Sequence, residues 1–128
     1  MSSYIQEPVY QKTYGVPDTN GYRATPDVSY NADPNNGYAV YDTIPYGGYT
    51  GWFEVGGTSA GTAQWAAMST LSNKTVTLTS LYKDAAVPSQ TKFREIVSGS
   101  NGSCGYYCLA RVGYNYVTGL GSPLTTAF

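Results

Sequence analysis

The sequence contains no histidine. This absence excludes a Ser-His-Asp triad, a Cys-His pair and a histidine-ligated zinc site built from this chain alone. A serine nucleophile would therefore need a carboxylate, rather than an imidazole, as its base.

Charge is also scarce. Asp, Glu, Lys and Arg make up 12% of the 128 residues and the formal net charge is −1, whereas about 25% of residues are charged in an ordinary soluble domain. No basic patch is available for nucleic acid, and no cationic amphipathic stretch indicates binding to a membrane surface. The 14 tyrosines are expected to cover much of the surface, as in an extracellular protein. The small charge also leaves little repulsion to oppose a homo-oligomer.

Long hydrophobic runs are absent as well. No stretch is apolar for long enough to span a bilayer, and residues 1–4 have neither the basic nor the apolar region of a signal peptide. We therefore expect a processed chain or a fragment of an extracellular protein.

The chain has two cysteines, Cys104 and Cys108. Two thiols cannot build a tetrahedral thiolate zinc site, and their spacing is not the C-x-x-C spacing of redox motifs. The pattern predicts a small disulfide-closed loop, and hence an oxidising compartment. Two free buried thiols are the alternative.

The length suits a single domain, residues 1–128. Residues 1–37 are rich in Pro, Gly, Asn and Asp, and we expect turns there with a short helix near residues 8–12. The pair Asn36-Gly37 is typical of a hairpin turn, and residues 37–42 follow it with a strand pattern.

The middle of the chain contains the strongest helix pattern. Residues 45–51 are expected to form a loop and residues 52–55 a short strand. A helix is predicted over residues 59–71, which are rich in Ala and carry Trp, Met and Leu. Because this helix is apolar on most of its surface, we expect it to be buried. For residues 76–82 helix and strand remain open.

The predicted strand at residues 52–55 leads through Gly56-Gly57-Thr58 to Ser59, at the start of the predicted helix. The free N–H groups of a first helical turn, together with the helix dipole, can stabilise the oxyanion that forms when a serine attacks a carbonyl. Serine is also a common N-cap residue, so a purely structural role for Ser59 stays open.

Further stretches surround this turn in a defined order. Residues 7–11 and 23–41 precede it, residues 93–102 follow it with a pattern close to F-x-D-I-T-x-G-x-N-G, and residues 113–123 close the chain. Together with Gly57-Thr58-Ser59, these stretches resemble the C-terminal half of the catalytic domain of sedolisins, the serine-carboxyl peptidases. The resemblance covers residues 7–123, although Ala63 stands where the family has proline.

The resemblance implies an α/β fold, namely a partial subtilisin-like fold with a mostly parallel sheet, one buried helix after the Gly-Thr-Ser turn, and many loops. It implies that Ser59 is the nucleophile. The family's Glu-Asp base pair and its oxyanion-stabilising Asp have no match among these residues, so we do not expect the 128 residues to cleave peptides unaided. The local carboxylates in question are Asp27, Asp33, Asp42 and Glu54, of which Asp27 matches a family position that we interpret as structural.

The resemblance also implies a calcium site. The positions that match the family's ligands are Glu95, Ile96, Arg111, Gly113 and Asn115. The family has two Asp side chains in this set, and here Glu95 and Asn115 replace them. Because calcium affinity follows carboxylate number and fit, the site is expected to be degenerate. A loop held by hydrogen bonds and the cysteine pair is favoured over a retained calcium ion.

Three functions follow from these observations. The chain is a piece of a peptidase, acting on peptide or protein substrates once an N-terminal half supplies the base. Alternatively, it is an extracellular structural protein that self-assembles into oligomers or filaments from a degenerate peptidase half. The third reading is a module that binds peptides without cleaving them. The intact turn around Ser59 favours the first.

Overall fold

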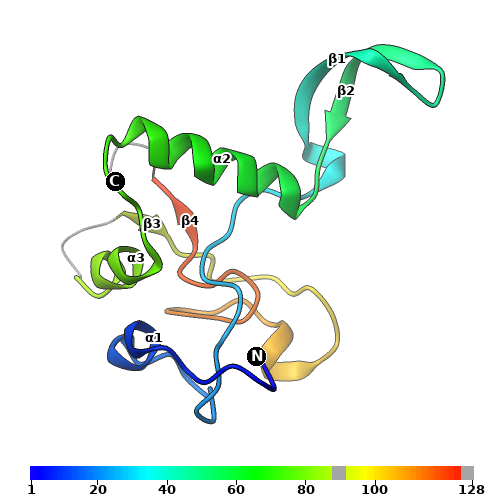
Figure 1. The fold of residues 1–128 in the computed structure, drawn as a ribbon. Helices are drawn as coiled ribbons and strands as arrows, with labels where there is room; N and C mark the ends of the chain where they lie inside the picture. Colours follow the sequence, from blue (N-terminus) through cyan, green and yellow to red (C-terminus); the bar gives the residue numbers. More distant parts are fainter. Residues whose placement is uncertain (88–91, 125–128) are drawn as a thin grey trace. The chain divides into compact units, whose positions relative to one another are not determined.

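The computed structural model describes residues 1–87 and 92–124. The elements are α1 (Val9–Tyr14), the 3-10 helix η1 (Pro34–Asn36), β1 (Tyr38–Tyr46), β2 (Tyr49–Val55), α2 (Thr58–Leu71), α3 (Leu78–Ala85), β3 (Phe93–Arg94), the 3-10 helix η2 (Gly105–Cys108) and β4 (Ser122–Pro123) (Figure 1). Contacts divide the chain into two compact units. Unit 1 comprises residues 1–29 and 73–128, and unit 2 comprises residues 30–72.

Unit 2 begins with an antiparallel hairpin. Strands β1 and β2 are joined at Gly47 and Gly48, whose φ angles of 59° and 80° suit the left-handed conformation that a tight hairpin turn requires. The predicted loop at residues 45–51 is therefore mostly strand and turn. The prediction of a hairpin turn at Asn36-Gly37 is wrong, because Asn36 ends η1 and Gly37 leads directly into β1.

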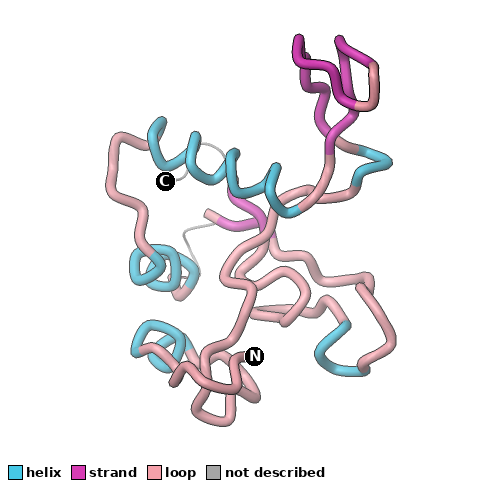
Figure 2. The backbone as a smooth tube through the Cα atoms, turned by 45° about the vertical axis from the view of Figure 1, so that its right-hand side comes forward, coloured by secondary structure: helices cyan, strands magenta, loops and turns pink. Residues whose placement is uncertain are grey.

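The hairpin carries its aromatic side chains in contact with one another but open to solvent. Tyr41 and Trp52 meet edge to face with ring centroids 5.3 Å apart, and Tyr49 and Phe53 do the same at 5.5 Å. Nearly all residues of β1 are exposed, and Trp52 retains 66% of its accessible surface. Figures 1 and 2 show the hairpin extending away from α2 instead of packing along it.

Helix α2 follows the hairpin after Gly56 and Gly57. Its 14 residues confirm the helix predicted over residues 59–71, but the expected burial is wrong: Gly61 is the buried residue of this helix. Most of its apolar residues, including Leu71 at 84% exposure, face solvent in the described structure. The amino-acid composition predicted the helix correctly. Its burial depends on which elements pack against it, and composition does not determine that.

Unit 1 is held together by a buried polar network between α1, α3 and the loop that joins α1 to unit 2. The side chain of Gln11 donates to the Ala24 carbonyl at 2.9 Å and to the Tyr82 hydroxyl at 2.9 Å, and accepts from the Ala24 N–H at 3.0 Å. Tyr82 in turn donates to the Asp27 carboxylate at 2.9 Å, which is also paired with Arg23. These contacts agree with the interpretation of Asp27 as a structural residue, which its match to a family position suggested. Residues 76–82, left open between helix and strand, contribute to α3.

The strand pairs of the described residues are both antiparallel. Strand β3 pairs with β4 through Phe93–Pro123 and Arg94–Ser122, and forms a two-stranded sheet like that of β1 and β2. A mostly parallel sheet is thus not confirmed. The reason for β1 and β2 is geometric: a two-residue turn can join only antiparallel neighbours, whereas parallel strands need a long crossover.

A disulfide between Cys104 and Cys108 closes the loop around η2, as predicted. Among the described residues, no helix has both the length and the apolar character needed to cross a membrane.

Candidate functional site

Ser59 lies on a sharp elbow between β2 and α2. Gly57 is the N-cap residue of α2 with φ 103° and ψ 159°, Thr58 is the first helical residue and Ser59 the second. The alternative in which Ser59 is merely the N-cap is therefore wrong. Ser59 is exposed, so the elbow presents its hydroxyl to solvent at the first turn of a helix.

The elbow packs against the segment that precedes β1. The Gly57 N–H donates to the Ala32 carbonyl at 2.8 Å. A Cβ atom built on Gly56 would lie 2.5 Å from the Pro34 Cα atom, closer than two carbons can approach. Gly56 is therefore needed for close packing, whereas Gly57 is needed for its positive φ. The sequence predicted a sharp turn but missed this support, although Asp33-Pro34 is a recognisable start signal for a short helix.

The electrostatics at Ser59 come from the helix itself. The first turn of α2 contains no acidic residue and its last turn no basic one. The first N–H groups of an α-helix have no intrahelical acceptor, and they carry the positive end of the helix dipole. A negative oxygen formed beside Ser59 would therefore be stabilised by backbone groups, without a charged side chain.

The carboxylates considered as local bases are engaged elsewhere. Within unit 2, Asp33 accepts from the Asn35 N–H at 2.9 Å, Asp42 from the Ile44 N–H at 2.8 Å, and Glu54 from the Gly37 N–H at 3.0 Å. Hydrogen bonds from the Asn36 side chain and the Asn35 backbone hold the pKa of Asp33 below its usual value. Among the hydrogen bonds of the described residues, none joins a carboxylate to Ser59.

The five positions that match calcium ligands do come together, within unit 1. The Asn115 side chain donates to the carbonyls of Ile96, at 3.2 Å, and Arg111, at 3.1 Å, and Glu95 accepts from the Gly113 N–H at 3.4 Å. Calcium requires six to eight oxygen ligands at about 2.3–2.6 Å. Here an amide nitrogen, instead of an oxygen, faces the two carbonyls, so these residues do not fit the ion. No group of three or more His, Cys, Asp or Glu side chains suited to a metal occurs among the described residues.

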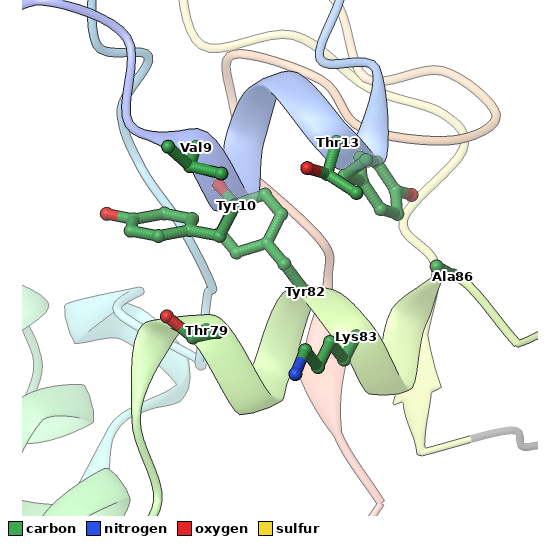
Figure 3. Close-up of a pocket in the computed structure, with 8 residues that line it drawn as sticks. Val9, Tyr10, Thr13, Thr79, Tyr82, Lys83 and Ala86 are labelled. Atoms are coloured by element: carbon green, nitrogen blue, oxygen red, sulfur yellow. The ribbon is translucent and has the colours of Figure 1, made fainter.

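Unit 1 also contains an apolar pocket of about 280 Å³ between α1 and α3. Figure 3 shows Val9, Tyr10 and Thr13 on one wall and Tyr82, with neighbours from α3, on the other. The Tyr82 hydroxyl is already hydrogen-bonded to Gln11 and Asp27. The pocket therefore offers mainly ring and methyl surface, and no residue predicted for the catalytic site lines it.

The fold of this chain is sedolisin-like. Among solved structures it is similar to Pseudomonas sedolisin, a serine-carboxyl proteinase in complex with two molecules of pseudo-iodotyrostatin. That similarity has a TM-score of 0.73 and 28% identity, and it covers 95% of this chain and 32% of the proteinase chain. No protein-family model matches the chain, and no curated protein matches it either.

Proposed function

We propose that this chain carries the nucleophile of a serine-carboxyl peptidase and that Ser59 is that nucleophile. The observation that supports the proposal most directly is the elbow. An exposed serine is the second residue of α2, after a glycine with φ 103°. A serine in this position has its hydroxyl beside unpaired helical N–H groups, which an ordinary surface serine lacks.

The proposed reaction is acyl transfer from a peptide bond. The Ser59 oxygen attacks the carbonyl carbon while its proton passes to a carboxylate base, and the carbonyl oxygen becomes negative beside the first turn of α2. When the C–N bond breaks, the carboxyl group that accepted the Ser59 proton gives it to the departing amine. Water then releases the acyl group from Ser59. The base is the Glu-Asp pair implied by the resemblance, supplied by residues other than those described.

The first test is native mass spectrometry on the protein isolated from its source, to find whether a segment carrying a Glu-Asp pair accompanies it. The complex is then assayed for peptide cleavage at acid pH and for binding of pseudo-iodotyrostatin, the compound present in the sedolisin complex.

We expect Ser59→Ala to abolish cleavage, by about 10³-fold or more, because the nucleophile is removed while the helix is kept. Ser69→Ala is the matched control, since Ser69 lies on the same helix and its hydroxyl donates to the Trp65 carbonyl at 3.0 Å. Equal cleavage by the Ser59→Ala and Ser69→Ala variants would contradict the role of Ser59.

Self-assembly into a structural protein is the second candidate, and the exposed aromatic hairpin favours it. Four aromatic side chains of the hairpin are each at least 60% exposed: Tyr41, Tyr46, Tyr49 and Trp52. Because aromatic side chains are enriched at protein interfaces, this exposure favours contact with another chain. A homopolymer without a partner chain, unaffected by Ser59→Ala, would replace the peptidase proposal with this one.

In either case we place the protein outside the cell. The disulfide between Cys104 and Cys108 supports an oxidising compartment, because such bonds seldom persist in the reducing cytosol.

A further inference from the structure

Asn115 is the centre of the loop cluster that closes unit 1. It is 2% exposed and forms five side-chain hydrogen bonds. Its Nδ2 atom donates to the carbonyls of Ile96 (3.2 Å) and Arg111 (3.1 Å), while its Oδ1 atom accepts from the Val117 N–H (3.2 Å), the Thr118 N–H (2.9 Å) and the Thr118 hydroxyl (3.0 Å). One side chain thus holds together the loop at residues 111–118 and ties it to the backbone of Ile96.

The partners determine which way round the amide lies. Backbone carbonyls only accept hydrogen bonds, and backbone N–H groups only donate them. The Ile96 and Arg111 carbonyls therefore require the NH₂ end of Asn115, and the Val117 and Thr118 N–H groups require its oxygen. A flipped amide would lose four of these bonds at once.

The oxygen atoms around the amide nitrogen could also serve as ligands of a cation. The carbonyl oxygens of Ile96 and Arg111 converge on one atom, the amide nitrogen, and both hydrogen bonds are partly buried. The Glu95 carboxylate belongs to the same cluster and accepts from the Gly113 N–H at 3.4 Å. Backbone carbonyls and carboxylates are the ligands of Ca²⁺ in proteins. The partly positive hydrogens of the Asn115 amide meet the same two oxygens without a metal.

A carboxylate at position 115 would turn these favourable contacts into repulsive ones. Its second oxygen would face the Ile96 and Arg111 carbonyls, oxygen against oxygen, at the distances that the amide nitrogen now keeps. Buried acceptors left without a donor are costly, and a buried unpaired charge more so. A cation between the three oxygens would remove the repulsion.

We propose that the Asn115 amide nitrogen takes the place of a calcium ion in this cluster. The loops at residues 95–96 and 111–118 are held without metal, and the single change Asn115→Asp makes their stability depend on calcium. This inference is independent of the role of Ser59.

The test compares thermal unfolding of the full chain in 5 mM EDTA and in 5 mM CaCl₂, concentrations on the order of those that saturate weak extracellular calcium sites. The wild-type protein is expected to melt at the same temperature in both. Asn115→Asp is expected to melt roughly 5–10 °C lower in EDTA, because the two donor bonds become repulsive contacts, and to recover most of that loss in calcium. Asn101→Asp is the matched control: Asn101 is exposed, so the same added charge should change neither melting temperature nor calcium response.

Either of two results would overturn the proposal. One is a wild-type melting temperature that rises in calcium and falls again in EDTA, since the cluster would then hold the ion already. The other is an Asn115→Asp variant that is destabilised but does not recover in calcium. If that variant does not fold in either buffer, equilibrium dialysis of the wild-type protein against ⁴⁵Ca²⁺ decides the question: bound calcium overturns the proposal, and no binding at 5 mM, roughly the top of the range of weak sites, upholds it.

Discussion

At the scale of single residues, the two glycines before α2 have different roles. Gly57 adopts φ 103°, a conformation that side chains with a Cβ atom rarely take. Gly56 has no such constraint, yet its missing Cβ atom leaves room for the backbone of Asp33 and Pro34. The sequence motif Gly-Gly-Thr-Ser therefore combines one conformational and one packing requirement, and both serve to place Ser59.

We predict that Gly56→Ala destabilises unit 2 by about 2–3 kcal/mol, because the clash is with backbone atoms that no side-chain rotation can move. The new Cβ atom would lie 2.5 Å from the Pro34 Cα atom. Thermal unfolding by circular dichroism measures the loss, and hydrogen exchange at the Gly57 N–H reports whether its bond to Ala32 opens.

Gly48→Ala is the control for this change. Gly48 has φ 80° but no atom within 4 Å of an added Cβ, so its substitution carries backbone strain of only about 1–2 kcal/mol and no clash. If Gly56→Ala costs no more than Gly48→Ala, the close packing of the elbow on Pro34 is not a source of its stability.

At the scale of elements, the short helix η1 supports the elbow, and Asp33 supports η1. The Asp33 carboxylate caps η1 by accepting from the Asn35 N–H at 2.9 Å and from the Asn36 side chain at 2.9 Å. The Asn31 side chain donates to the Asn36 carbonyl at the other end of the turn. The segment from Asn31 to Asn36 is thus a hydrogen-bonded platform against which Gly56 and Gly57 pack.

This platform is expected to loosen in strong acid. The hydrogen bond from the Asn36 side chain, and to a smaller extent that from the Asn35 N–H, lowers the pKa of Asp33. The Asp33 carboxylate therefore binds a proton less tightly in the folded chain than in the unfolded chain. Its contribution to stability is complete above the unfolded pKa of about 3.9. It is lost as the pH falls through the lower folded pKa.

The amide resonance of Gly57, followed by NMR from pH 6 to pH 2, on the order of two units either side of an ordinary Asp pKa, should therefore show a transition below pH 4. Asp33→Asn should remove that transition, because an amide keeps the cap geometry without a titrating group. Asp42→Asn is the matched control and should leave it in place. A Gly57 transition that survives Asp33→Asn would show that another group controls the elbow.

The elements show how far sequence reasoning reaches. Residues 59–71 were predicted as a helix because helix formers and the preceding glycines are local signals. The burial of that helix was wrong because burial depends on what packs against it, and α2 has only Gly61 buried. The hairpin turn was misplaced because Asn36-Gly37 and Gly47-Gly48 are both good turn sequences, and only the pairing of β1 with β2 distinguishes them.

The candidate site shows the same division. Ser59 and its turn were visible as a motif, and so was the pairing of Cys104 with Cys108. The five positions that match calcium ligands were found only through the family resemblance, since Glu95 and Ile96 lie in a different stretch of the sequence from Arg111, Gly113 and Asn115. The orientation of the Asn115 amide could not be predicted, because it is set by the Val117 and Thr118 N–H groups and by the carbonyls of Ile96 and Arg111.

At the scale of the molecule, the buried core of unit 1 includes three tyrosines whose hydroxyls are hydrogen-bonded to residues far away in the sequence. Tyr114 donates to the Pro26 carbonyl at 2.7 Å and Tyr116 to the Pro17 carbonyl at 2.8 Å, while Tyr82 donates to Asp27. The rings also contact one another, with Tyr114 and Tyr116 edge to face at 5.6 Å. Three phenols thus connect the end of the chain and α3 to its beginning, and each is a donor only while it is protonated.

We predict that the fold is lost cooperatively in alkali. Burial raises the pKa of Tyr116 to about 12, and burial also raises the pKa values of Tyr82 and Tyr114. Above pH 10, roughly the pKa of a free phenol, the unfolded chain releases these protons and the folded chain does not, so stability falls as the pH rises. Each phenol that stays protonated costs about 1.4 kcal/mol per pH unit. Three of them remove about 4 kcal/mol per unit from a domain whose total stability is on the order of 5–15 kcal/mol.

Unfolding is therefore expected above about pH 10, where the unfolded chain releases these protons and the folded chain keeps them. Exposed tyrosines such as Tyr4 and Tyr46 should ionise near pH 10, roughly the pKa of a free phenol. A later rise in phenolate absorbance at 295 nm, from the three buried hydroxyls, should coincide with the change in circular dichroism. Tyr114→Phe should make the transition less steep by about one proton. Tyr4→Phe, at a residue that is 94% exposed, should leave the steepness of the circular dichroism transition unchanged. Complete tyrosine ionisation near pH 10, roughly the value for free phenols, with the circular dichroism signal intact would mean that these phenols are not held in a closed core.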